Sequence, residues 1–261
     1  MTTATTVLHV YGHGPDEIER ALEEIFAREE RPRVLRLQGS YSAVLRRALA
    51  PELEASYRYL QLQPHAGSPW TPLLELGNRT EGLDRALSAA LDGAPVFSSF
   101  VYGNAVSGYR MVRGGVEVDR YLSDPEDFAS LQTDNTDPEE APAAAEDSTF
   151  DPATGEVEAV RGHPERFADL LPSGMLPADF ARIVLEPGWW EQHFAAAPMD
   201  VETQAFGEES AEDDELVDEE DRMRCIGLAL ELWTPTEYPF AGELEDIANQ
   251  EVGPAVALAF T

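Results

Sequence analysis

Residues 71–121, TPLLELGNRTEGLDRALSAALDGAPVFSSFVYGNAVSGYRMVRGGVEVDRY, decide the fold class of this chain. The stretch predicts an apolar strand at residues 72–76, a helix at 81–91 and a second apolar strand at 96–102. A β-hairpin follows, because Gly114-Gly115 separates two alternating segments and two glycines suit a turn that needs positive φ. The stretch therefore predicts a fold that mixes helices with a sheet.

The Gly114-Gly115 turn also predicts a register for the hairpin. Residues equidistant from the turn should pair, namely Arg113 with Val116, Val112 with Glu117, Met111 with Val118 and Arg110 with Asp119. Met111 and Val118 would then share the buried face, while Arg110 and Asp119 would meet on the exposed face. Such a surface pair contributes about 0.2–1 kcal/mol, so it indicates register more than it adds stability.

The beginning of the chain repeats the strand-helix-strand pattern. A strand is expected at residues 5–12, a helix from Pro15 that ends before Pro32, and a strand at 33–37. Aligning residues 10–25 with residues 75–90 places Gly12 on Gly77, and ERAL at 19–22 on DRAL at 84–87. We interpret residues 5–38 and 71–103 as two copies of one unit, with a helix at 41–49 and a strand at 57–62 between them.

The second half of the chain has a different composition. Residues 129–158 are mostly Asp, Glu, Pro, Ala, Ser and Thr, which is typical of a flexible acidic linker or surface loop. Short helices are expected at 164–171, 177–185 and 188–194, and alternating residues predict strands at 226–233 and 256–260. The expected fold is α+β (α/β-like), with an α/β domain at residues 1–128. Residues 159–261 should complete its sheet or build a small one of their own.

Two segments resemble known proteins. Residues 107–128, SGYRMVRGGVEVDRYLSDPEDF, and residues 162–171, GHPERFADLL, are similar to a segment of uncharacterised bacterial proteins without assigned activity. The resemblance covers about a quarter of the chain. It implies a soluble bacterial protein and identifies no catalytic residues.

The charge of the chain is large and unevenly distributed. The formal net charge is −32, with a sequence pI near 4.2, and residues 131–261 hold 32 acidic residues against five Arg. A field of this sign disfavours direct binding to nucleic acid or to an anionic membrane and favours a basic protein partner. All 18 basic residues are Arg, which excludes lysine Schiff-base chemistry and a P-loop lysine.

The acidic run at residues 208–221 is the first candidate site, because ten of its fourteen residues are Asp or Glu. The simplest interpretation is a solubilising loop; the functional one is a polyanionic surface that docks on a basic protein. The candidate contact residues are seven acids of this run and two upstream tryptophans that could anchor an interface. They are Glu212, Asp213, Asp214, Glu215, Asp218, Glu219, Glu220, Trp189 and Trp190.

The second candidate site is the turn at Gly12, His13 and Gly14, together with the corresponding turn at residues 77–80. A glycine turn before a helix could bind an anion, and His13 could act on a ligand there. The turn is not a GxGxxG motif, however, and the acids at positions 16, 17 and 19 oppose phosphate. This alternative predicts an enzyme or a small-ligand sensor.

Other chemistry has little support in the sequence. Cys225 is the only cysteine, and neither His163 nor His193 has a second ligand at metal-binding spacing. Residues 134–137 suggest a calcium loop but lack the Gly and Glu that such a loop needs. We expect no cofactor and no metal. The preferred hypothesis is a non-enzymatic inhibitor, immunity-type or adaptor protein that binds a basic partner.

The location follows from composition. The chain opens without a basic and apolar leader, and no apolar run approaches the roughly 18 residues of a membrane span. A single cysteine agrees with a reducing compartment. We therefore expect a soluble, cytoplasmic protein, while the sequence leaves its oligomeric state open.

Overall fold

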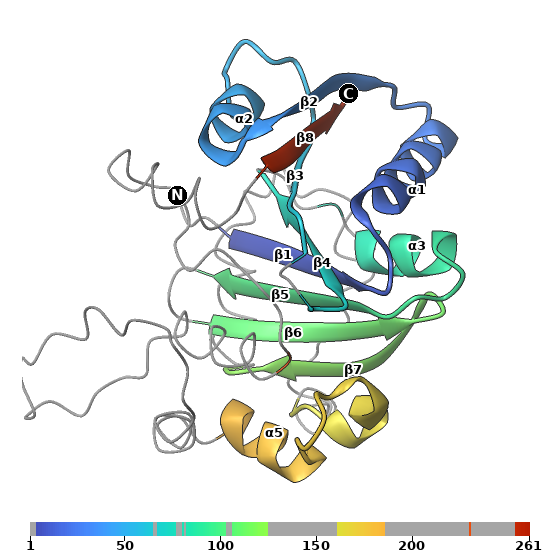
Figure 1. The fold of residues 1–261 in the computed structure, drawn as a ribbon, viewed down its shortest axis with the longest axis vertical. Coiled ribbons are helices and arrows are strands. Elements are labelled where there is room, and N and C mark those ends of the chain that lie inside the picture. Colours follow the sequence, from blue (N-terminus) through green and yellow to red (C-terminus); the bar gives the residue numbers. More distant parts are fainter. Residues whose placement is uncertain are drawn as a thin grey trace, which may run out of the picture.

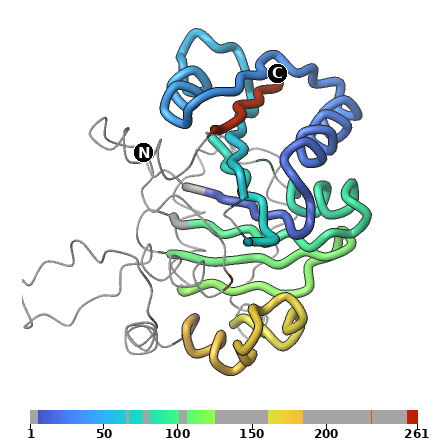
Figure 2. The backbone as a smooth tube through the Cα atoms, in the orientation of Figure 1, coloured from blue at the N-terminus to red at the C-terminus, as the bar shows by residue number. Residues whose placement is uncertain are grey.

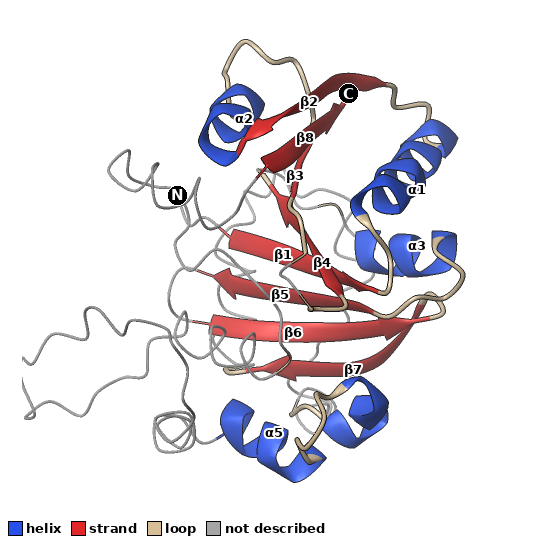
Figure 3. Ribbon diagram, viewed as in Figure 1, coloured by secondary structure: helices blue, strands red, loops and turns tan. Residues whose placement is uncertain are grey.

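The computed structural model describes residues 4–64, 67–76, 80, 82–102, 106–124, 161–185, 230 and 254–261. Within these residues the chain forms one eight-stranded sheet in the order β2-β8-β3-β4-β1-β5-β6-β7, with helices on both faces (Figures 1 and 3). All neighbouring strands are antiparallel. The expectation of a mixed α+β fold is confirmed, and the sheet is its larger part.

The strands are β1 (Ala4–Tyr11), β2 (Arg33–Ser40), β3 (Tyr57–Gln61), β4 (Trp70–Glu75), β5 (Val96–Tyr102), β6 (Val106–Arg113), β7 (Val116–Leu122) and β8 (Pro254–Phe260). The helices are α1 (Pro15–Arg28), α2 (Tyr41–Ala48), α3 (Leu83–Ala90), the 3₁₀ segment η4 (Pro164–Leu170) and α5 (Pro177–Leu185). Each helix of the first half begins within two residues of its expected start.

Helices α1 and α3 lie side by side on one face of the sheet (Figure 1). The apolar stripe of α1, including Ile18, Leu22 and Phe26, is fully buried against this face. Leu83 and Leu87 of α3 join the same core. Their helical spacing places these side chains on one side of each helix, so burial of this core fixes the two helices on the sheet.

The opposite face has two separate covers. Adjacent strand residues point to opposite faces, so Leu73 belongs to the core under α1 while Leu74 packs under α2. Farther along the sheet, η4 and α5 cover an aromatic core that contains Phe97, Tyr109 and Phe167. The two covers lie over different ends of the sheet (Figure 3).

The last strand, β8, lies inside the sheet between β2 and β3, as the red segment in Figure 2 shows. Every residue from Ala255 to Phe260 is buried. The large residues Val256, Leu258 and Phe260 pack under α1, whereas the small Ala255 and Ala257 pack under α2. The predicted alternation therefore separates large from small side chains rather than buried from exposed ones, because both faces of β8 are covered.

The hairpin departs from its predicted register at Val118. Gly114 and Gly115 have φ of 63° and 74°, and the first two pairs form as predicted. A bulge then shifts the ladder, so that Met111 pairs with Asp119 and Arg110 pairs with Arg120. The predicted Met111–Val118 and Arg110–Asp119 pairs are wrong, because two residues of β7 oppose one of β6 at the bulge. The shift places Asp119 on the buried face.

The later segments agree with expectation at the two short helices and at β8, but not at Leu230. Residues 164–170 and 177–185 form the two short helices, although η4 is kinked at Phe167, where φ is −132°. Of the strand expected at 226–233, the structure describes only Leu230, which lies in a turn with 1% of its surface exposed in the aromatic core. The helix expected at 188–194 lies outside the described residues.

A substitution at Gly108 tests the packing of β6. A Cβ atom there would lie 2.6 Å from both Phe100 Cζ and the Tyr121 carbonyl oxygen. We expect Gly108→Ala to lower the free energy of unfolding by about 1–3 kcal/mol in urea denaturation, because a backbone atom cannot move aside. At Gly14 the same methyl group would meet nothing within 4 Å, so Gly14→Ala should change stability by less than about 1 kcal/mol. Equal effects would contradict the packing.

Candidate functional site

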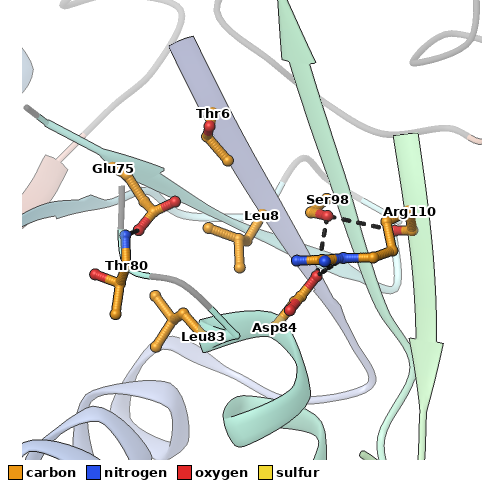
Figure 4. Close-up of a pocket in the computed structure, with 8 residues that line it drawn as sticks. All are labelled: Thr6, Leu8, Glu75, Thr80, Leu83, Asp84, Ser98 and Arg110. Carbon is orange, nitrogen blue, oxygen red and sulfur yellow. Dashed lines mark hydrogen bonds and ion pairs between the residues drawn. The ribbon is translucent and has the colours of Figure 1, made fainter. Parts of the chain in front are cut away.

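The most polar cluster within the described fold lies under α3. Asp84, in the first turn of α3, is 2% exposed and accepts hydrogen bonds from Arg110 Nε at 2.5 Å and Ser98 Oγ at 3.2 Å (Figure 4). The backbone N–H of Arg85 donates to the other carboxylate oxygen at 2.8 Å. The helix N-terminus also favours a negative charge there. Asp84 is thus a satisfied buried anion that ties α3 to β5 and β6.

A second group of polar side chains faces this ion pair. The Thr80 backbone N–H donates to Glu75 Oε1 at 2.9 Å, and the Tyr59 hydroxyl forms a hydrogen bond with Thr80 Oγ1. Burial raises the pKa of Tyr59 far above its usual value. The cavity between the two groups, which Figure 4 shows, has a volume of about 10 Å³. This is about the size of one water molecule.

An open groove lies between the end of α1 and the start of β2. It is lined by Glu23, Ala27, Glu30, Arg31, Pro32, Arg33 and Phe260. Arg33 pairs with Glu23, and the Arg31 guanidinium lies 4.4 Å from the centre of the Tyr57 ring. Two cations and two anions leave this groove without net charge.

A side chain of helix α1 accepts a hydrogen bond from the Gly12-His13-Gly14 turn that precedes the helix. Gly12 has φ of 74° and donates its N–H to the Pro69 carbonyl at 2.8 Å. The Gly14 N–H donates to Glu17 Oε2 at 3.0 Å, and this hydrogen bond lowers the pKa of Glu17. The His13 side chain lies 3.4 Å from the same carboxylate. Glu17 therefore occupies the position at which the sequence suggested an external anion.

The strands that lead into the two turns of the alternative site are neighbours in the sheet. Tyr11, which precedes the first turn, pairs with Trp70 at the start of β4. Glu75, which precedes the second turn, pairs with Thr6 near the start of β1. The residues that precede the two turns thus lie at opposite ends of the β1–β4 ladder, and residues 77–79 of the second turn lie outside the described residues.

The residues proposed to contact a basic partner lie outside the described residues. These are Glu212, Asp213, Asp214, Glu215, Asp218, Glu219, Glu220, Trp189 and Trp190. The structure does describe where their segment is attached. It starts after α5, passes Leu230 in the aromatic core and returns to the sheet at β8.

The sequence interpretation missed a buried carboxylate at Asp119. Tyr109 Oη donates to Asp119 Oδ2 at 2.9 Å, and the His163 backbone N–H lies 2.8 and 2.9 Å from the two carboxylate oxygens. Beside this contact, the backbone of Arg161 pairs with that of Tyr121 in an isolated antiparallel β-bridge. Asp119 thus fastens the segment that leads into η4 to the edge of the sheet.

Close packing around Asp119 also explains Gly162. This glycine has φ of 80°, and a Cβ atom there would lie 2.7 Å from Tyr109 Oη. Burial raises the pKa of Asp119, although its hydrogen bonds act in the opposite direction. No pattern in residues 116–122 distinguishes the bulge, so the simple alternation assigned Asp119 to solvent.

Metal and membrane sites were sought only in the part of the chain that the structure describes. There, no three His, Cys, Asp or Glu side chains come close enough together to hold a metal ion. The helices described are also too short or too polar to cross a membrane.

Comparisons of the chain with protein-family models, curated proteins and solved structures give no match. Its function must therefore be argued from its own residues.

Removal of the Asp84 carboxylate tests the ion pair under α3. We expect Asp84→Ala to lower the free energy of unfolding by about 3 kcal/mol, because Arg110, whose side chain is 17% exposed, would lose its partner. The control is Glu24→Ala, since Glu24 and Arg28 are 65% and 71% exposed and 3.8 Å apart. That change should cost less than about 1 kcal/mol in the same urea denaturation. A small effect of Asp84→Ala would mean that the pair is not stabilising.

The raised pKa of Asp119 predicts a pH dependence of stability. Between the unfolded pKa, about 3.9, and the higher folded pKa, the folded state binds the proton more tightly. The contribution of Asp119 to the free energy of unfolding is therefore fully present below the unfolded pKa and is lost as pH rises through the folded pKa. We therefore expect the free energy of unfolding of the wild type to fall, relative to that of Asp119→Asn, as pH rises. Urea denaturation of both proteins across this range measures it, and a pH-independent difference would refute it.

Proposed function

We propose that the protein is a non-enzymatic interaction protein, of the inhibitor, immunity or adaptor type, that binds a basic protein partner through its acidic C-terminal half. The observation that carries the proposal is the charge distribution. Residues 131–261 hold 32 acidic residues and five Arg, whereas residues 1–130 hold 18 and 13. A net charge this concentrated attracts a cationic surface over a distance comparable to the Debye length, about 8–10 Å in physiological salt.

The described framework supports this division of roles. The segment at residues 125–160 leaves the sheet after β7 and returns at Arg161, which forms a bridge with Tyr121 of the same strand. The described residues on either side of this segment therefore lie at one sheet edge. The second acidic segment is attached at α5, at Leu230 and at β8. Both segments thus start and end on a packed core.

The proposed contact surface is the run at residues 208–221. Its seven acids between Glu212 and Glu220 would meet the basic surface, and Trp189 or Trp190 would anchor the rim. Charge of this kind raises association rates and selects against acidic partners more than it adds affinity. We place the protein in the cytoplasm, without direct contact to nucleic acid or membrane. Its proposed regions are 1–128, 129–158 and 159–261.

We also propose that the strand-helix-strand units at residues 5–38 and 71–103 arose by duplication. Glu19 and Asp84 occupy aligned positions, and each is largely buried on the inner side of its helix. Glu19 accepts from Arg36 of β2 at 2.6 Å, and Asp84 accepts from Arg110 of β6 at 2.5 Å. The same acidic position thus ties each helix to an arginine of the sheet.

Neutralising the run at residues 208–221 tests the proposed function. In one variant the seven proposed acids become Gln or Asn. In the control, seven acids of the 129–158 segment are neutralised instead (Asp134, Asp137, Glu139, Glu140, Glu146, Asp147 and Asp151), which gives the same net charge. A native lysate is passed over each immobilised protein at low salt, and a retained protein is purified and titrated calorimetrically.

We expect the wild type and the control to retain the same basic protein and the run variant to lose it. The dissociation constant should rise at least about tenfold between 50 and 500 mM salt, since exposed charges are screened. Equal retention by the run variant would contradict the proposal, as would tight binding that high salt does not weaken.

A further inference from the structure

The outer strands at the two edges of the sheet differ in their contacts with the rest of the described chain. At β7, Arg161 forms a bridge with Tyr121, and Arg166 Nη1 donates to the Val118 carbonyl at 3.4 Å. Strand β2, at the other edge, pairs with β8 and with no other strand of the described residues (Figure 1). One side of β2 therefore presents a row of backbone donors and acceptors that another strand can pair with.

The sequence of this edge is basic, whereas the chain as a whole is acidic. Residues 31–51 contain five Arg and none of the 50 acidic residues. Four of these arginines are exposed on β2 and α2, namely Arg33, Arg36, Arg46 and Arg47. Glu19 and Glu23 of α1 bind Arg33, Glu19 also binds Arg36, and Glu52 binds Arg47, so these guanidinium groups are held in place, and each has further N–H groups that can donate. An acidic protein thus carries its most basic segment along a strand whose outer side pairs with no described strand.

The two faces of β2 differ in character. Arg36 and Gln38 pair with Leu258 and Val256, which places them on the face of the sheet that carries α1. Leu35 and Leu37 lie on the α2 face and are half-buried. A bulge interrupts the ladder at Val34, and residues 35–40 then run regularly. This regular part is as long as an average strand of five or six residues.

We propose that the outer edge of β2 binds an extended acidic segment of a partner protein, which adds a ninth strand to the sheet. Side chains directly opposite each other on neighbouring strands share a face. The incoming strand would therefore carry acidic residues on the α1 face, against Arg36 and its neighbours, and apolar residues on the α2 face, against Leu35 and Leu37. Its sequence alternates between the two kinds.

Charge decides between this partner and a second copy of the chain. An antiparallel pairing of two β2 strands centred on Arg36 would bring the arginines of the two copies together, and like charges opposite each other destabilise a sheet. An acidic strand would instead place carboxylates opposite these arginines, which is a favourable pairing. The inference concerns a different surface from the proposed function, so either can fail without the other.

Labelled peptides test the proposal on the full-length protein. The first is an octapeptide with the alternating sequence Glu-Val-Glu-Leu-Asp-Val-Glu-Leu, and the second has the same composition with its acids grouped together. In the third peptide Lys replaces every acid. We expect fluorescence anisotropy to show binding of the alternating peptide at least about tenfold tighter than of the other two. Hydrogen exchange should slow at residues 35–40 and not in β7.

A charge change at Gln38 tests the location without removing an ion pair, since this exposed side chain stands beside Arg36 on the α1 face. Relative to wild type, we expect Gln38→Lys to tighten and Gln38→Glu to weaken binding of the alternating peptide, each by about threefold. The matched control places Lys or Glu at Val116, which is 64% exposed on β7, and should leave the affinity nearly unchanged.

Several outcomes would overturn the proposal. Equal binding of the grouped-acid peptide would show that charge alone is recognised, and failure of the alternating peptide to bind would remove the site. Equal affinities of the two Gln38 variants would place any binding elsewhere. Sedimentation showing a dimer of the wild type that Gln38→Glu strengthens would identify a second copy as the occupant.

Discussion

The pairing of β8 with both β2 and β3 is the interaction on which the sheet depends. No other described strand connects β2 to the remaining six strands. The carbonyl and N–H groups of β8 are buried with it and must all find partners, which the two flanking ladders supply. Its side chains extend this role to both faces, since they support α1 on one side and α2 on the other. The two ends of the chain are thus parts of a single core.

Three carboxylates show how this fold uses negative charge internally. Glu19, Asp84 and Asp119 are each at most 9% exposed, and each joins an element to the sheet through donors that the chain supplies. Breaking such a buried contact is costly because the partner loses its hydrogen bond. The remaining excess of acid lies mostly beyond residue 130 and contributes to none of these three contacts. These three carboxylates therefore serve the fold itself.

Periodicity predicted the elements of the first half well, because an amphipathic helix such as α1 shows its buried face directly in the spacing of Ile18, Leu22 and Phe26. It could not predict which strands become neighbours, since the position of β8 is set by pairing over the whole chain. The bulge at Val118 was equally invisible, because one extra residue leaves the local alternation intact while it turns Asp119 inward. The polar cluster under α3 was hidden for a related reason. Asp84 and Arg110 each resemble surface residues until the sheet brings them together.

The place of β8 also sets the order in which the molecule can be completed. During synthesis β2 and α2 emerge early, but the strand that joins them to the sheet is made last. Closing so long a loop costs conformational entropy before any contact compensates for it, and sheets with distant partners fold slowly. Until β8 is made, β2 lacks its one neighbouring strand among the described residues, and the side of β3 that β8 covers is unpaired.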